Sequence, residues 1–277
     1  MISFVPVSIG FDTQHVDPFL TRINGTNTTL EALWGATINN VTIRMLLNMR
    51  SGLEEYDDQQ IRRETLDFPD WDISPQDYLA GNVVLKKFAF PPGTKSNYNS
   101  IGYLLLGLVL ATHARRPDGS ELTDWAQLDQ RSAAIPAALL AQGKYQSTTF
   151  FTRGRCSAYP HVAHYFACGN KTAPAHVDMF ERSCLNGWGF GNLGISAGDA
   201  ASFFYDLLGP EPRIVGGRAR MLMSQFTGWG TTDDVVGEGH HYGLGLWTDP
   251  ILTLPRMFNT SIAGMWPYTS CKADRDL

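Results

Sequence analysis

The sequence predicts a fold of the α/β class (α+β in the stricter sense), in which a helical region is inserted between two parts of one sheet. Three observations support this prediction. Helical patterns dominate the middle of the chain, and strand patterns appear late. The chain has 277 residues, of which 43% are hydrophobic, so it can bury one large core or two interleaved ones.

The N-terminal part carries few structural signals. Residues 1–40 are rich in turn-forming residues and weakly patterned, so we expect an irregular segment there. Residues 42–49 predict a short helix. We expect Ser51-Gly52 to end this helix, because glycine tolerates the left-handed conformation that follows a helix end.

The next two segments differ in polarity. Residues 54–80 are acidic and aromatic, and Pro69 and Pro75 should break any long element among them. Residues 101–113 are apolar on nearly all sides. A helix of that composition belongs in the middle of a helical layer.

The second half of the chain begins with helical signals and then changes. We expect a helix around residues 133–142 and a strand or hairpin at 159–168. The glycine-rich residues 187–198 predict a turn, after which Asp199 should cap a helix that runs to about Leu208.

Two elements complete the predicted fold. A second helix should cover about residues 217–225. Residues 242–247 alternate small and large side chains, which indicates a strand that faces helices. No internal repeat or low-complexity tract interrupts the chain.

Composition excludes several classes of function. The net charge is −5, the pI is about 5.8, and no run of Lys and Arg is longer than a pair. Nucleic acid and anionic membrane surfaces are therefore not expected partners. The longest apolar run, residues 101–111, is too short to cross a bilayer.

Two features favour a secretory origin, although no signal peptide precedes them. The chain has four cysteines, an even number. It also has five glycosylation sequons, at Asn24, Asn27, Asn40, Asn170 and Asn259. Coincidence in a cytosolic protein is the alternative. Secretory features without a signal peptide lead us to expect that the true N-terminus is missing.

The most informative segment is residues 88–107. The turn Pro92-Gly93 leads to Tyr98, and the apolar helix begins three residues later. This layout can hold a phenol rigidly at the mouth of a cleft, where a base would lie. A tyrosine before a helix often only caps a core through its hydroxyl, so this position needs further support.

Four segments are informative together, in this order: residues 42–53, 90–107, 189–208 and 242–247. They resemble the serine β-lactamase and penicillin-binding-protein family, in the branch of class C β-lactamases, D-alanyl-D-alanine carboxypeptidases and esterases. The resemblance implies a β-lactamase-like fold with a mostly antiparallel sheet flanked by helices. It also implies acyl transfer through a serine acyl-enzyme, on a small-molecule or peptide-like amide or ester, without a cofactor or metal.

The family's nucleophile motif is absent. No Ser-x-x-Lys occurs in the chain. The resemblance places Tyr98 at the base position and Ser100 at the position of the motif asparagine. The serine reaches less far than an amide and lacks its second donor. A phenol ionises near pH 10, so a base at this position needs a neighbouring lysine.

The family's closing strand, Lys-Thr-Gly or His-x-Gly, has no clear counterpart. His241-Tyr242-Gly243 fits the pattern but comes too early. Lys171-Thr172-Ala173 precedes the glycine-rich turn and ends in alanine, and residues 260–270 offer no basic residue at the expected place. The resemblance therefore predicts a hydrolase homologue that is inactive as written, with a sheet that lacks strands.

Two explanations of this inactivity remain open. The chain is either a fragment of an active hydrolase or a degenerate homologue that binds a ligand or acts as a scaffold, and we favour the fragment. The predicted organisation is an irregular segment at 1–40, a partial β-lactamase-related domain at 41–250 and a divergent tail at 251–277.

Two further constellations have simpler interpretations. Cys156, His161, His164 and Cys168 could form a zinc site, but residues three apart on a strand face opposite sides. We therefore favour a disulfide, with Cys156–Cys168 as the first guess among the possible pairings. The acidic residues at 54–58 predict an exposed loop rather than paired catalytic carboxylates.

Overall fold

The computed structural model describes residues 29–56, 58–81, 85–160, 162–164, 166–168, 176–225, 227–228 and 241–248. Its α-helices in chain order are α2 (Leu30–Trp34), α3 (Ile43–Leu47), α4 (Asp58–Asp67), α5 (Pro75–Ala80), α6 (Ser100–His113), α7 (Gln130–Ala134), α8 (Ala137–Ala141), α9 (Ala197–Leu208) and α10 (Gly217–Met223). Its 3-10 helices are η1 (Ala36–Asn40), η2 (Trp125–Gln127), η3 (Cys156–Ala158) and η4 (Met179–Glu181).

The strands in the described ranges are short and pair only in antiparallel fashion. β1 pairs with β4 and β2 with β3, while β5, β6 and β7 form a three-stranded sheet in that order. Their bounds are β1 (Thr149–Phe150), β2 (Phe166–Cys168), β3 (His176–Asp178), β4 (Leu193–Gly194), β5 (Thr227–Gly228), β6 (His241–Tyr242) and β7 (Trp247–Thr248). Helices with a small antiparallel sheet that does not close confirm the predicted fold class.

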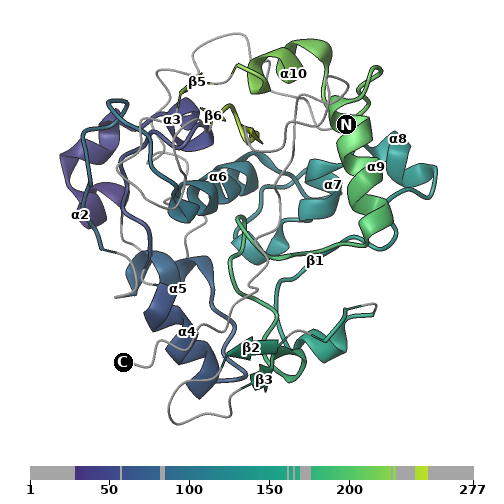
Figure 1. Cartoon of the computed structure of the whole chain (residues 1–277), viewed down its shortest axis with the longest axis horizontal. Helices are drawn as coiled ribbons and strands as arrows, with labels where there is room; N and C mark the ends of the chain where they lie inside the picture. The colour runs from purple at the N-terminus through teal and green to yellow at the C-terminus, as the bar shows by residue number, and fades with distance from the viewer. Residues whose placement is uncertain are drawn as a thin grey trace.

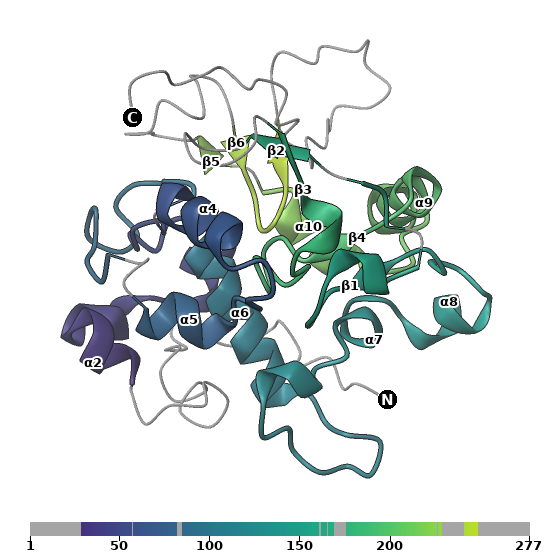
Figure 2. The same ribbon diagram turned by 90° about the horizontal axis from the view of Figure 1, so that it is seen from below.

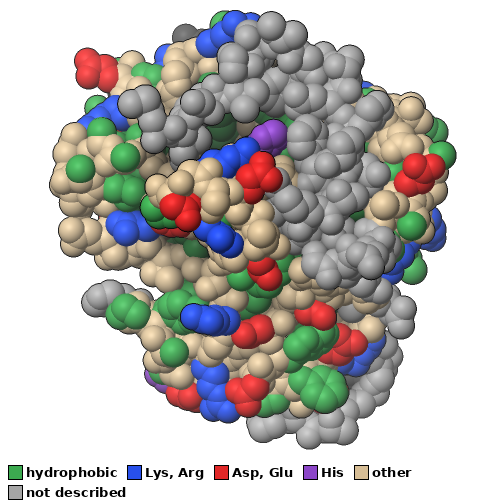
Figure 3. Space-filling view, turned by 180° about the vertical axis from the view of Figure 1, so that it is seen from behind, with side chains coloured by type: hydrophobic (Ala, Val, Ile, Leu, Met, Phe, Trp, Pro, Cys, Tyr) green, Lys and Arg blue, Asp and Glu red, His purple; other side chains and the backbone are tan. Residues whose placement is uncertain are grey.

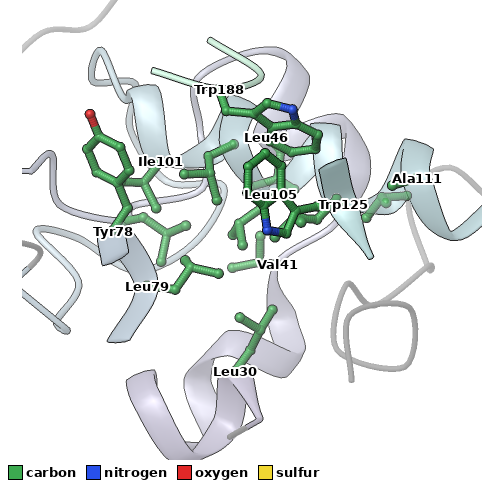
Figure 4. Packing of buried hydrophobic residues seen from close by; sticks show 14 of the residues in the cluster. Leu30, Val41, Leu46, Tyr78, Leu79, Ile101, Leu105, Ala111, Trp125 and Trp188 are labelled. Atoms are coloured by element: carbon green, nitrogen blue, oxygen red, sulfur yellow. The ribbon is translucent and has the colours of Figure 1, made fainter. Parts of the chain in front are cut away.

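Helix α6 organises the molecule. Figures 1 and 2 place it between α2, α4 and α5 on one side and α7, α8 and α9 on the other. Nine of its fourteen residues are buried, as the apolar composition predicts. In Figure 4 its Leu105 lies among Val41, Leu46 and Trp125, with Trp188 alongside. Each leucine buried in this way contributes about 2 kcal/mol.

A glycine in α6 makes room for the glycine-rich turn. A Cβ atom on Gly107 would lie 2.9 Å from the ring of Trp188, which is fully buried. Gly189 beside that tryptophan has φ +83°, a conformation that suits glycine. The turn predicted at residues 187–198 therefore presents a tryptophan to the middle of the central helix.

The segment before residue 41 is not wholly irregular. Thr29 caps α2 by accepting a hydrogen bond from the Ala32 amide at 3.1 Å, and Leu30, Trp34 and Ile38 are buried in the main core. The expectation of an irregular segment is wrong for this part, and residues 1–28 lie outside the described ranges. A helix of five residues has no sequence periodicity to detect, and packing stabilises it.

Proline begins an element where the sequence predicted a break. Pro75 is the first residue of α5, where its missing N–H costs nothing. Ser74 and Asp77 form a capping box in front of it. In the predicted helix at 133–142, by contrast, Pro136 separates α7 from α8.

Two local predictions need correction in the second half. Ser196, not Asp199, caps α9, because its hydroxyl accepts from the Asp199 amide at 3.1 Å. The Asp199 carboxylate instead accepts from the Ser147 amide at 2.8 Å. Residues 242–247 do not form one strand: Tyr242 ends β6, Trp247 begins β7, and the residues between them form a turn in which Gly245 has φ +76°.

A second, smaller core joins α8 to α9. Tyr145 and Leu207 are buried in it together with Ile135, Leu139 and Ile214. At its edge lies a group that we call the carboxylate cluster, which consists of the buried Tyr145 and Asp206 and the partly exposed Lys144 and Arg213. Asp206 is 1% exposed and accepts hydrogen bonds from Lys144 Nζ and from the Tyr145 hydroxyl, each at 2.5 Å.

The disulfide joins Cys156 to Cys184, so the predicted pairing with Cys168 is wrong. The two cysteines lie on neighbouring antiparallel segments, where Cys156 N–H donates to Arg182 and Cys184 N–H donates to the Gly154 carbonyl. Their Cα atoms are 4.7 Å apart. This pairing uses Cys156 and leaves no thiolate there for zinc, and it encloses the β2–β3 pair.

The described surface carries charges of both signs. On the face shown in Figure 3, Lys and Arg side chains lie among Asp and Glu side chains rather than in a single patch. Within the described ranges, no helix has the length and apolar character required to cross a membrane.

Candidate functional site

The site begins at the end of α3, where a methionine takes the place expected of glycine. Met49 has φ 60°, the Arg50 amide donates to Met45 O at 2.7 Å, and the Met49 amide donates to Leu46 O at 3.4 Å. These two bonds form a Schellman motif. The predicted stop at Ser51-Gly52 therefore falls two residues late, and a buried side chain occupies the left-handed position.

Gly52 makes a different turn, on which the Pro-Gly segment rests. It has φ +77°, and a Cβ atom there would lie 2.2 Å from the carbonyl oxygen of Phe90. The Ala89 amide donates to Gly52 O at 2.9 Å. Arg50 and Gly93 are joined twice, through Arg50 Nη2 to Gly93 O at 2.6 Å and Gly93 N–H to Arg50 O at 2.8 Å.

Tyr98 is fixed through both of its neighbours. The Asn97 amide donates to Met49 O at 3.0 Å, and the Asn99 amide contacts Met49 Sδ at 3.3 Å. Asn99 also caps α6, since its side chain accepts from Gly102 N–H and donates to Leu53 O. The half-buried phenol of Tyr98 is thus held against the end of α3.

Two more tyrosines meet Tyr98 at this point. Met49 and Tyr242 are buried together, and Tyr98 and Tyr103 pack against them. We call these four residues the phenol cluster. The Tyr103 hydroxyl lies 2.9 Å from Leu47 O and 2.9 Å from the Tyr242 hydroxyl. The cluster therefore joins α3, α6 and β6.

The electrostatics of the cluster oppose ionisation. Burial raises the pKa of Tyr242 to about 12, partly offset by the hydrogen bond with Tyr103 and increased again by the nearby Tyr98. Burial also raises the pKa of Tyr103 well above the usual value of a phenol, and Tyr242 and Tyr98 add to the effect. Tyr103 and Tyr242 are therefore neutral hydrogen-bonding groups near neutral pH.

Ser100, the other predicted site residue, is the first residue of α6 and is buried. Its amide donates to Glu55 Oε2 at 2.5 Å. A carboxylate is favoured at a helix N-terminus, where the peptide dipoles present partial positive charge. Glu55 was expected in an exposed acidic loop, which is wrong, since it is partly buried at the start of the central helix.

The remaining predicted motifs do not join this site. His164 lies just before β2. Its Nδ1 is 2.6 Å from Asp178 Oδ2, and its ring stacks on that of Phe180 with the ring centroids 4.2 Å apart. His241 begins β6, whose Tyr242 enters the phenol cluster. His161, Lys171-Thr172-Ala173 and residues 260–270 lie outside the described residues.

Sequence reasoning missed three contributors: Met49, Tyr103 and Glu55. Tyr103 stood inside the quoted segment 90–107, but an apolar helix gives no sign of which side chain will meet a distant strand. Met49 could have been suspected from the absence of glycine at the expected helix end. Glu55 had no signal beyond its charge.

Comparison with known proteins bears on this geometry. The family model described as Beta-lactamase matches residues 24–267. The D-stereospecific amidohydrolase from Streptomyces sp. has a similar structure, with 19% identity, a TM-score of 0.59, and coverage of 87% of this chain and 64% of that one. No curated protein matches the chain.

Two further solved structures are similar. The octameric penicillin-binding protein homologue from Pyrococcus abyssi has 19% identity and a TM-score of 0.57, with 87% of this chain and 48% of that one covered. D-amino acid amidase from Ochrobactrum anthropi SV3 has 18% identity and a TM-score of 0.52, with 76% and 54% covered. The chain thus spans less than two thirds of the length of these three proteins, and the likeness shows the fold.

Proposed function

The chain belongs to the beta-lactamase family, and we propose that it supplies the tyrosine-bearing side of a pocket for a small-molecule or peptide-like amide or ester, without hydrolysing that compound by itself. The observation that carries this proposal is the anchoring of Tyr98. Its two neighbours bond to the same buried methionine, so the phenol has a fixed place beside the end of α3.

Two arguments support the absence of turnover. An acyl-enzyme needs a nucleophile with a base beside it, and the 277 residues contain no Ser-x-x-Lys. A Thr-x-x-Lys does occur, from Thr269 to Lys272, and it lies outside the described residues. A phenolic base near neutral pH needs a cation to favour its ionised form. Burial is the largest effect on Tyr103 and Tyr242 and favours the neutral form of both, and at Tyr242 the hydrogen bond with Tyr103 offsets it only in part.

The ligand class follows from the family and from the names of the similar proteins. Those names include a D-stereospecific amidohydrolase and a D-amino acid amidase, the latter solved with L-phenylalanine amide. We propose D-amino acid amides as the first compounds to test, with simple esters and a cephalosporin beside them. Neutral phenols can donate to the carbonyl oxygen of any of these.

Turnover is the first test. The purified chain is incubated with a p-nitrophenyl ester, a chromogenic cephalosporin and D-phenylalanine amide, and product is measured against buffer. We expect no product above the buffer rate. Turnover that Tyr98→Phe abolishes, while Tyr205→Phe on the exposed face of α9 retains it, would contradict the proposed inactivity and show an unrecognised nucleophile.

Binding without turnover is the second test, and it examines the ligand-binding alternative. A ligand that binds only the folded chain raises its Tm in a saturable way. We expect D-phenylalanine amide to raise the Tm of the wild type and of Tyr205→Phe, and to have a smaller effect on Tyr98→Phe. A chain whose Tm responds to none of the compounds would act as a scaffold rather than as a binding protein.

A further inference from the structure

One sequence motif has no part in the site described above. Asn40-Val41-Thr42 is a sequon for N-linked glycosylation, in which the asparagine amide accepts the sugar and a hydroxyl is required at the third position. Among the five sequons of the chain, it is the one whose three residues all lie within the described ranges. The structure therefore shows how these three residues are placed.

The three residues of this sequon differ in exposure. Asn40 is the last residue of η1 and is exposed. The next two residues, Val41 and Thr42, are 0% and 6% exposed. The Val41 amide donates to Ile38 O at 2.9 Å. The Thr42 hydroxyl accepts from the Met45 amide at 3.3 Å as the cap of α3. The acceptor residue thus lies at the surface, while the required hydroxyl is buried in a helix cap.

The surface beside Asn40 suits the attachment of a large polar group. Residues 35–37, which lie on or next to η1, are exposed as well. Figures 1 and 2 show α2, against which η1 packs, at the edge of the molecule. The neighbouring Asn39 is less exposed, and its amide donates to Glu31 Oε2 at 3.2 Å. A sugar on Asn40 would extend into solvent without displacing a buried side chain.

The disulfide Cys156–Cys184 is an independent observation. Disulfides form and persist in oxidising compartments, which include the lumen in which N-linked glycans are attached. The sequon and the disulfide therefore call for the same environment.

We propose that Asn40 carries an N-linked glycan and that the sugar is attached before α3 forms. In the transfer, Asn40 Nδ2 loses a proton and bonds to the anomeric carbon of an oligosaccharide carried on a lipid diphosphate, and the lipid diphosphate leaves. The transferring enzyme has to reach the Thr42 hydroxyl, because the motif requires that group. In the folded chain the hydroxyl is buried and bonded to the Met45 amide, so the folded sequon is closed to the enzyme. The inference is independent of the proposed ligand pocket.

The first experiment locates the glycan. A signal sequence is added in front of the full chain, which is translated in the presence of microsomes, and only product protected from added protease is analysed. Peptide N-glycosidase in ¹⁸O-labelled water converts a glycosylated asparagine to a labelled aspartate, which mass spectrometry detects. Chymotrypsin cuts after Trp34 and so separates Asn40 from the two sequons that precede it. We expect the label at position 40, and its absence from the protected wild-type chain would overturn the proposal.

Three variants show that the sequon directs the modification. Asn39→Gln leaves the sequon intact, and Thr42→Ser keeps the hydroxyl, so both should retain the label at position 40. Thr42→Ala removes the hydroxyl and should lose the label. A label that persists in Thr42→Ala, or that is lost in Thr42→Ser, would refute recognition through the Thr42 hydroxyl.

The second experiment tests the order of folding and modification. The full chain is prepared without glycans in bacteria, folded with its disulfide formed, and incubated with oligosaccharyltransferase and its lipid-linked donor. A peptide of residues 36–46 serves as the unfolded control. We expect the peptide to be glycosylated and Asn40 of the folded chain to stay unmodified. Equal modification of the two would refute the order, and a peptide that is not modified would count against the sequon itself.

Discussion

The phenol cluster and the carboxylate cluster share an unusual backbone feature and differ in charge. Each contains a buried residue other than glycine with positive φ, Met49 at 60° in the first and Tyr145 at 61° in the second. Such residues carry local strain of about 1–3 kcal/mol and persist only when their surroundings hold them. The tyrosines packed around Met49 are uncharged, whereas the side chains bonded around Tyr145 include the ionised Asp206 and Lys144.

The contrast shows that a lysine beside a tyrosine is not enough to make a base. Lys144 lies next to Tyr145, but its ammonium group is 2.5 Å from Asp206, which also accepts from the Tyr145 hydroxyl. Burial raises the pKa of Tyr145, and the bond to the Asp206 carboxylate raises it further. The Lys144 charge is paired with the Asp206 carboxylate, so Tyr145 remains a neutral phenol near neutral pH.

The largest expected effect is the removal of the carboxylate. Asp206→Ala leaves Lys144 and the buried Tyr145 hydroxyl without their shared acceptor, which should lower the free energy of unfolding by about 3–5 kcal/mol. Urea denaturation measures this loss. Glu211→Ala, at an exposed position, should change the free energy of unfolding by less than about 0.5 kcal/mol. Equal losses in the two variants would remove the contrast between the clusters.

The next effect concerns the backbone turn at Gly52, which supports the segment that carries Tyr98. Gly52→Ala places a methyl group where the Phe90 carbonyl lies and forces a left-handed alanine, so we expect a loss of about 3 kcal/mol. Gly119→Ala is the matched control, because Gly119 has φ +84° and no atom lies within 4 Å of the place its methyl group would take. It should cost only the backbone strain, about 1 kcal/mol. Similar unfolding midpoints for the two variants would show that the Phe90 carbonyl moves aside at little cost in stability.

The smallest expected effect is a loss of folding stability at alkaline pH that depends on Tyr242. The folded pKa of Tyr242 is about 12, above the ordinary value near 10. Its contribution is therefore complete below pH 10 and is lost as the pH rises toward 12, by at most about 2–3 kcal/mol. Tyr242→Phe should flatten this alkaline decline in urea denaturation series recorded from pH 7 to 11.

Asp206 acts in the opposite direction. Its burial favours the neutral acid, but Lys144 and Tyr145 outweigh it and lower the pKa of the carboxyl group. Its contribution to stability is present above its pKa in the unfolded chain, near 4, and is lost as the pH falls through its lower pKa in the folded chain.

The outcome for Tyr242 also has a contradicting result. If the free energy of unfolding falls as steeply at alkaline pH in Tyr242→Phe as in the wild type, the description of Tyr242 as a buried neutral phenol is wrong.

Much of the helical layer was accessible from local signals. Residues 101–113 are apolar nearly all round and form α6 almost as predicted, and Thr42 caps the short α3. The glycine-rich turn also appears at the expected place. Predictions were wrong where partners come from distant segments, as for the cysteine that pairs with Cys156 or the cap of α9.

The family, the central helix and the position of Tyr98 in front of it could all be derived from the amino-acid order, because they depend on composition, turn residues and the succession of motifs. The contacts of Tyr98 with Met49 and Tyr242, and the neutralisation of the lysine beside Tyr145 by Asp206, arise only when the chain folds. A phenol responds to whatever packs against it, and here those neighbours lie up to about a hundred and forty residues away along the chain.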